Sequence, residues 1–231
     1  MLSQVVVEVR FKRGVVYLDR CGSLTLRIQD ALGPPFEASL PSMQGAQLTN
    51  GPERLVVGYG TDAFSVTQAW MANPVRVELI APPTWEEVAT VLSVGDQVTR
   101  VGARFVVALS VPDVATGEKR IVDSGICPGP PWGGGLGHAT GGTWTFAATT
   151  AGGGKVRAGL AATPITVKGG VLPADLASVI PQAAILLDFD HVLFEVDEPQ
   201  KLSRAQLKDF VRASWQATKK SATPMRRELG L

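Results

Sequence analysis

Alternation of apolar and polar residues predicts most of a large antiparallel sheet. Near the N-terminus, Val5, Val7, Val9 and Phe11 alternate with mostly polar neighbours, the period-two pattern of a strand with one dry face. The longest alternating run is residues 101–111, and its length predicts a central strand; Arg100, Gly102 and Arg104 begin its opposite face. Further strands are expected over residues 54–59, 63–69, 75–80, 143–150, 155–168 and 185–194.

Helical spacing predicts two or three helices packed on that sheet. Apolar residues recur every three or four positions over residues 17–32, although 24–28 also alternate and leave a strand open there. Pro82 and Pro83 are expected to close the strand before them, and Thr84 with Glu87 forms a capping-box pattern for a second, short helix. A further short helix is expected over residues 172–180.

The last helix has the clearest start in the chain. Ser203 is a natural N-cap with Gln206 three residues later, and Leu202 with Leu207 can form a hydrophobic staple. Apolar residues on one face predict that this helix, expected over residues 202–218, covers the sheet with its basic side outward.

The order of elements predicts one α+β domain spanning residues 1–231. Residues 36–52, rich in Pro, Gly, Ser and Asn, are interpreted as a connector, and residues 125–142 as a Gly/Pro-rich loop. A loose echo of strand, helix and strands also allows two similar halves, residues 1–70 and 75–231.

Charge is balanced overall but unevenly distributed. The 231 residues carry 22 basic and 21 acidic side chains, a net charge of +1 that names no polyanionic partner. From residue 201 onward the chain carries +6, so weak nucleic-acid binding by the terminal helix and tail is one hypothesis. Its candidate residues are Arg212, Lys219, Lys220, Arg226 and Arg227.

Cysteine count and hydropathy indicate the compartment. Two cysteines, Cys21 and Cys127, provide neither a disulfide framework nor a complete zinc site. No stretch approaches the length of a membrane span, and the first residues lack the pattern of a leader peptide. The expectation is a cytoplasmic protein with no membrane association, cofactor or metal.

Asp188 and Asp190 are the strongest candidates for catalysis. They follow an apolar run in the pattern of a phosphatase nucleophile motif, and alternate strand residues project to one face, where they could hold Mg²⁺. This chemistry also needs a Ser or Thr, a Lys and further acidic residues later in the sequence. Few residues remain after Asp190 to provide them. The alternative is two carboxylates on the wet face of an edge or terminal strand.

Other motifs are incomplete. The glycine-rich segments lack the third glycine of a dinucleotide fingerprint and the hydroxyl of a phosphate-binding loop. His191 follows Asp190, but adjacent strand residues point to opposite faces. Within the Gly/Pro-rich loop, an exposed tryptophan is a credible anchor for another protein, so Trp132, Leu136 and His138 are candidate partner-binding residues.

Three segments together resemble a sporadically distributed prokaryotic family of roughly this length without an established activity. They are residues 5–11 (VVVEVRF), 100–106 (RVGARFV) and the strand containing 187–190 (LDFD) with its following amphipathic helix. The Gly/Pro-rich insert near 125–142 departs from the family. The resemblance implies one α+β unit with a long sheet and provides no catalytic residues.

The leading hypothesis is a non-enzymatic binding or assembly protein of the bacterial cytosol. It would recognise another protein through a sheet face or the Gly/Pro-rich loop, because the sequence contains abundant patterned sheet and no complete catalytic constellation. Metal-dependent phosphoryl or nucleotide chemistry at Asp188 and Asp190 is the enzymatic alternative. The sequence does not predict the oligomeric state.

Overall fold

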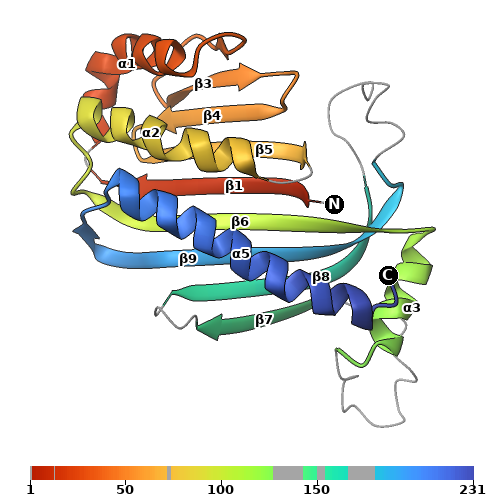
Figure 1. Ribbon diagram of the computed structural model, residues 1–231. Helices are drawn as coiled ribbons and strands as arrows, with labels where there is room; N and C mark the ends of the chain where they lie inside the picture. The colour runs from red at the N-terminus through yellow and green to blue at the C-terminus, as the bar shows by residue number, and fades with distance from the viewer. Residues whose placement is uncertain (1, 13, 72–73, 127–142, 150–153, 166–179) are drawn as a thin grey trace.

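One large antiparallel sheet, covered on one face by helices, dominates the computed structural model, which describes residues 2–12, 14–71, 74–126, 143–149, 154–165 and 180–231 (Figure 1). Within these residues the nine strands are β1 (Leu2–Phe11), β2 (Glu37–Ala38), β3 (Gly45–Asn50), β4 (Leu55–Gly60), β5 (Ala63–Met71), β6 (Val98–Val111), β7 (Thr143–Thr149), β8 (Lys155–Pro164) and β9 (Ala183–Gln200). The four α-helices there are α1 (Tyr17–Leu32), α2 (Val75–Leu92), α3 (Val114–Asp123) and α5 (Arg204–Glu228), and a 3-10 turn, η1 (Gly14–Val16), precedes α1. The predicted α+β class is confirmed.

The strand order repeats on either side of the sheet centre. The order is β2-β3-β4-β5-β1-β6-β9-β8-β7, and all the pairings are antiparallel. From β1 the next strands outward are β5, β4 and β3; from β6 they are β9, β8 and β7. In chain order the first series is β1, α1, the four strands β2 to β5 and α2, and the second is β6, α3, the three strands β7 to β9 and α5, so β2 has no counterpart in the described residues of the second series. The second series begins at β6 rather than near Val75. Whether these halves are domains in their own right stays a prediction.

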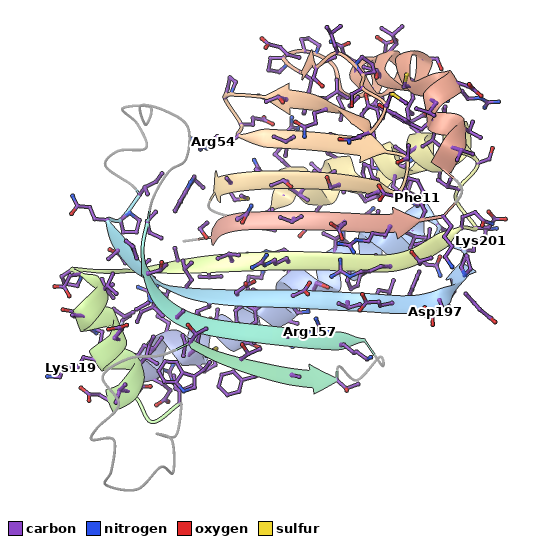
Figure 2. All side chains as sticks on the ribbon, turned by 180° about the vertical axis from the view of Figure 1, so that it is seen from behind. Phe11, Arg54, Lys119, Arg157, Asp197 and Lys201 are labelled. Carbon is purple, nitrogen blue, oxygen red and sulfur yellow. The ribbon has the colours of Figure 1, made fainter. Side chains whose placement is uncertain are left out.

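The described helices lie on one face of the sheet, and no described helix covers the other face, which we call the open face. Figure 1 shows α2 and α5 in front of the strands and α1 above β3, and Figure 2 shows the opposite face without a helix before it. α1 packs on the same face as α2, since its Thr25 hydroxyl is 2.7 Å from the hydroxyl of the buried Tyr59 of β4. The alternating residues of β1, Val5, Val7, Val9 and Phe11, are buried beneath the helices. α3 belongs to the same side, since its Gly117 packs against Val111, Ala162 and Ile185.

The strand predicted over residues 75–80 is wrong, because these residues form the start of α2. Val77, Ile80, Ala81, Trp85 and Val88 are all buried, which is one continuous helical face across both prolines. Burial of this face outweighs the amide hydrogen bonds that the prolines cannot donate.

The capping box expected at Thr84 is also wrong. Thr84 lies inside α2, where its hydroxyl donates to the Ile80 carbonyl at 2.8 Å. Glu87 pairs with Arg27 of α1 instead, 2.6 Å away. Both side chains therefore support α2 in ways that do not mark its start.

Two other segments differ from expectation. Residues 36–52, interpreted as a connector, contain β2 and β3; Leu48 and Asn50 of β3 are fully buried. Helix α3 was not predicted, although Asp113 is its N-cap and accepts a hydrogen bond from the Thr116 amide at 2.7 Å. Residues 172–179 of the helix expected over 172–180, and residues 127–142 of the expected loop, lie outside the described residues; Ile180 is described and is not helical.

The terminal helix follows the prediction closely. Ser203 and Gln206 form the expected capping box, and Leu202 and Leu207 are both buried. The helix continues beyond residue 218 to Glu228 and covers the sheet. Within the described part of the chain, no helix has the length and hydropathy needed to cross a membrane.

Candidate functional site

A charged hollow of about 400 Å³ lies on the open face of the sheet, over its central strands. We call it the charged hollow. It is formed by residues of β1, β6, β9, β8 and β7, so no single segment of the sequence contains it. Its charged lining consists of Glu8, Arg10, Arg100, Arg104, Arg157, Asp188 and Asp190.

Strand pairing explains why these side chains meet. Arg104 of β6 lies opposite Asp190 of β9, and Asp190 lies opposite Arg157 of β8. In an antiparallel pair, opposite residues point to the same face, and neighbouring strands lie about 4.8 Å apart. The register therefore places a row of arginine, aspartate and arginine across three strands on the open face.

Asp188 is committed to an ion pair with Arg104. The Arg104 Nε donates to Asp188 Oδ1 at 2.8 Å, and a second guanidinium nitrogen donates to the other carboxylate oxygen. This two-point geometry is the strongest form of an arginine and carboxylate pair. The hydrogen bonds from Arg104 to Asp188 raise the pKa of Arg104. Both carboxylate oxygens of Asp188 are thus already engaged.

Arg100 is the centre of a second cluster. One of its nitrogens lies 2.6 Å from Glu8 Oε1, which also accepts from the Arg10 Nε at 2.8 Å. Other Arg100 nitrogens lie 3.6 Å from Asp190 and 3.6 Å from Glu195. The Arg100 side chain is only 18% exposed and lies over Gly102, whose missing side chain leaves room for it.

Asp190 differs from Asp188 in both contacts and protonation. Among the described residues it makes no hydrogen bond, and its ion pair with Arg100 is long. Burial raises the pKa of Asp190, against the opposing charges of Arg100, Arg104 and Arg157. A half-buried carboxylate with a raised pKa, lying in a hollow and without a hydrogen-bond donor among the described residues, is typical of a site that binds a ligand or partner.

The prediction that Asp188 and Asp190 project to one face agrees with the hollow, and β9, which carries them, is the last strand in the chain. An edge position for this strand is wrong. β9 lies inside the sheet, between β6 and β8. In the described part of the chain, no group of three or more His, Cys, Asp or Glu side chains is arranged to hold a metal ion. The metal-dependent hypothesis stays a prediction, and the pairing of Asp188 with Arg104 weighs against it.

His191 lies on the opposite face from the hollow, under α5. Its Nε2 is 2.8 Å from the Thr218 hydroxyl, and its ring packs edge-on against Phe105. Burial lowers the pKa of His191 to about 4. The neutral ring therefore joins α5 to β9, and it is not oriented by Asp190.

The remaining predicted site residues are apart from the hollow. Trp132, Leu136 and His138, with Cys127, lie outside the described residues. Cys21 is a free, partly exposed cysteine of α1. The predicted basic residues are all exposed on α5, on the helix-covered side of the sheet: Arg212, Lys219, Lys220, Arg226 and Arg227.

The sequence reasoning missed the arginines and Glu8 of the hollow. Their signal was present, because Glu8, Arg10, Arg100 and Arg104 are the charged residues on the wet faces of two predicted strands. What was missing was the strand order: β1, β6, β9 and β8 become neighbours only in the folded sheet.

The chain matches no model of a known protein family and no curated protein at a significant level. The resemblance noted from three sequence segments therefore stays a prediction, and function has to be argued from the hollow itself.

Proposed function

We propose that this chain is a non-enzymatic binding or assembly protein that recognises another protein through the open face of its sheet. One observation carries the proposal: every helix in the described part of the chain lies on one face, and the other face has seven charged side chains around a hollow. Arginine is enriched in protein interfaces, and four arginines line this hollow.

The form of the hollow favours a protein over an enclosed small molecule. Sites for small molecules are usually deep and mostly apolar, with a few polar groups. Here seven of the twelve lining residues are charged, and the surrounding strands extend on both sides as a broad surface (Figure 2). We keep the cytoplasm as the expected compartment, because the chain has so few cysteines.

Site-specific photocrosslinking tests the proposal. A photoreactive amino acid at Thr145, which lines the hollow, is expected to form a covalent adduct with a specific protein in extracts of the producing cells. The matched control is the same amino acid at Gln216, exposed on α5. The adduct from Thr145 should also decrease when Arg104 is changed to Glu. Adducts from Gln216 alone, or from neither position, contradict the proposal.

A second candidate function is weak nucleic-acid binding by α5. Helical spacing of about 100° per residue places its five predicted basic residues on one side, within about 120°, and all five are exposed. One of them, Lys219, lies 5.5 Å from the centre of the Trp215 ring. Fluorescence anisotropy of a labelled duplex should show binding that weakens with salt and falls in Arg226→Ala/Arg227→Ala. Salt-independent or unchanged binding contradicts this candidate.

Calorimetry tests the enzymatic alternative. Mg²⁺ or Mn²⁺ should bind the wild-type protein and fail to bind Asp188→Asn if Asp188 is a metal ligand. No binding, or binding that the substitution leaves unchanged, removes this alternative.

A further inference from the structure

The charged hollow has one more arginine than it has carboxylates. Four arginines face three carboxylates, and three of the arginines donate hydrogen bonds to those carboxylates. Arg10 and Arg100 donate to Glu8, and Arg104 donates to Asp188. These bonds account for two of the three carboxylates, so Arg157 and Asp190 are left over.

Arg157 and Asp190 face each other without pairing. They are opposite partners in the β8 and β9 register, the arrangement in which opposite charges commonly bond. No hydrogen bond or ion pair within 4.0 Å joins Arg157 to any residue in the described part of the chain. Asp190 is nearer to Arg100, at 3.6 Å. The guanidinium of Arg157 carries five N–H donors, and none of them is used by another described residue.

The surroundings leave space beside Arg157. Gly159, two residues along β8, also lines the hollow and presents no side chain. A side chain there would meet the Asp188 Cβ at 3.5 Å, an ordinary contact, so the space is bounded by Asp188 and is not blocked. Figure 2 labels Arg157 on β8, on the face of the sheet that carries no helix.

We propose that the charged hollow binds an anionic group, a carboxylate or a phosphate, with Arg157 as its main ligand and Arg104 as a second donor across the sheet. The register places these two arginines on either side of Asp190. A guanidinium fork matches the two oxygens of a carboxylate or phosphate. Asp190 would then accept a hydrogen bond from a donor beside the anion, such as a backbone amide.

This inference rests on the proposed function and names the chemistry of the partner's contact. An acidic side chain of a protein and a free phosphate offer the same oxygens to Arg157. Burial that raises the pKa of Asp190 also disfavours its negative charge, which makes the hollow more receptive to an incoming anion.

NMR titration of the ¹⁵N-labelled full chain tests the inference. The probes are inorganic phosphate and the peptide acetyl-Gly-Asp-Gly-amide, each at constant ionic strength, with acetyl-Gly-Asn-Gly-amide as the uncharged control. We expect saturable shifts of the Gly102 and Gly159 amides with at least one anionic probe and none with the control peptide. Binding to the peptide alone assigns the site to an acidic side chain, and binding to phosphate alone assigns it to a small anion.

Variants separate Arg157 from general charge. Arg157→Gln should weaken binding of the anionic probe by at least about fivefold. The affinity of Arg157→Lys should lie between those of the wild type and Arg157→Gln, because lysine keeps the positive charge but lacks the forked guanidinium. Lys208→Gln removes one positive charge from an exposed position of α5 that belongs to none of the proposed sites, and it should leave binding unchanged. Absence of saturable shifts, or equal affinity in wild type and Arg157→Gln, overturns the inference. If either of these results were obtained while Thr145 still formed adducts, the anion-binding inference would be wrong and the protein-binding proposal would remain supported.

Discussion

The two sides of the sheet share a strand order but have different open faces. On β3, β4 and β5 the open face carries glycine, hydroxyl, amide and small apolar residues, among them Gln47, Thr49, Val56, Gly58, Ser65 and Thr67. On β6, β9 and β8 the equivalent surface carries Arg100, Arg104, Asp188, Asp190 and Arg157. Because β3, β4 and β5 form their part of the sheet without such charges, the architecture does not require the charged hollow. The charges are better explained by recognition.

The two sides of the sheet also differ in how deeply their outer strands are buried. β3 buries Ala46, Leu48 and Asn50, whereas six of the seven residues of β7 are exposed, including Phe146 at 40%. The first half is therefore the better packed, and the second half has more freedom to carry surface chemistry.

Truncation of Trp85 should be the most destabilising change. Trp85 is fully buried in α2, lies 6.0 Å from the rings of Phe11 and Phe64, and donates from its indole nitrogen to the Leu202 carbonyl. Trp85→Ala should lower the free energy of unfolding by about 3 to 5 kcal/mol. Trp144→Ala, at a half-buried position on β7, should cost less than half as much. Urea denaturation measures both, and equal losses contradict the contrast in packing.

Acid should weaken the contact between α5 and β9 through His191. The unfolded chain takes up a proton near the ordinary pKa of 6.5, whereas the folded protein does so only near pH 4. Stability from this group is thus complete above pH 6.5 and is lost as the pH falls toward 4, by about 3 kcal/mol in total.

Urea denaturation between pH 7 and 4 measures that loss. His191→Gln keeps a side chain that can bond Thr218 but removes the titration, so its stability should fall less steeply than that of the wild type. The other titrating groups are common to both proteins and cancel in the difference. Parallel curves for the two proteins exclude this role of His191.

Neutralising the two aspartates should have small and opposite effects. Asp188→Asn loses the two-point pair with Arg104, but that arginine is 54% exposed, so the cost should be about 1 kcal/mol or less. The raised pKa of Asp190 means that the folded protein disfavours the charged carboxylate relative to the unfolded chain. The protonated form therefore stabilises the fold at low pH, and this stabilisation is lost as the pH rises through the folded-state pKa. Asp190→Asn should therefore leave stability at pH 7 unchanged or slightly higher. A larger loss for Asp190→Asn than for Asp188→Asn contradicts the distinction between them.

Local patterns in the sequence were sufficient for the elements with regular periodicity. β1, β6, the β4–β5 hairpin and the start of α5 follow from alternation or from the capping residues Ser203 and Gln206. Prediction failed where tertiary burial overrides local preference. Pro82 and Pro83 read as a stop, yet α2 continues through them because the residues on both sides face the same core.

The site depended on information that the sequence pattern does not contain. Asp188 and Asp190 were recognisable as a pair on one strand, but the arginines that define their chemistry lie 84 to 90 positions earlier in the chain or come from β8. Antiparallel pairing with register shifts near Arg100 brings them together. Residue spacing along one strand predicts a shared face, whereas contacts between strands require the sheet order.

Recognition of a partner through the open face can be tested by measuring the affinity of the partner captured through Thr145 for two charge-reversed variants. Arg157→Glu changes the hollow, and Arg212→Glu makes the same change on exposed α5, across the sheet from it. We expect the dissociation constant, measured by calorimetry, to rise at least about tenfold for Arg157→Glu and to stay at the wild-type value for Arg212→Glu. Loss of affinity in Arg212→Glu with wild-type affinity in Arg157→Glu would contradict recognition through the open face.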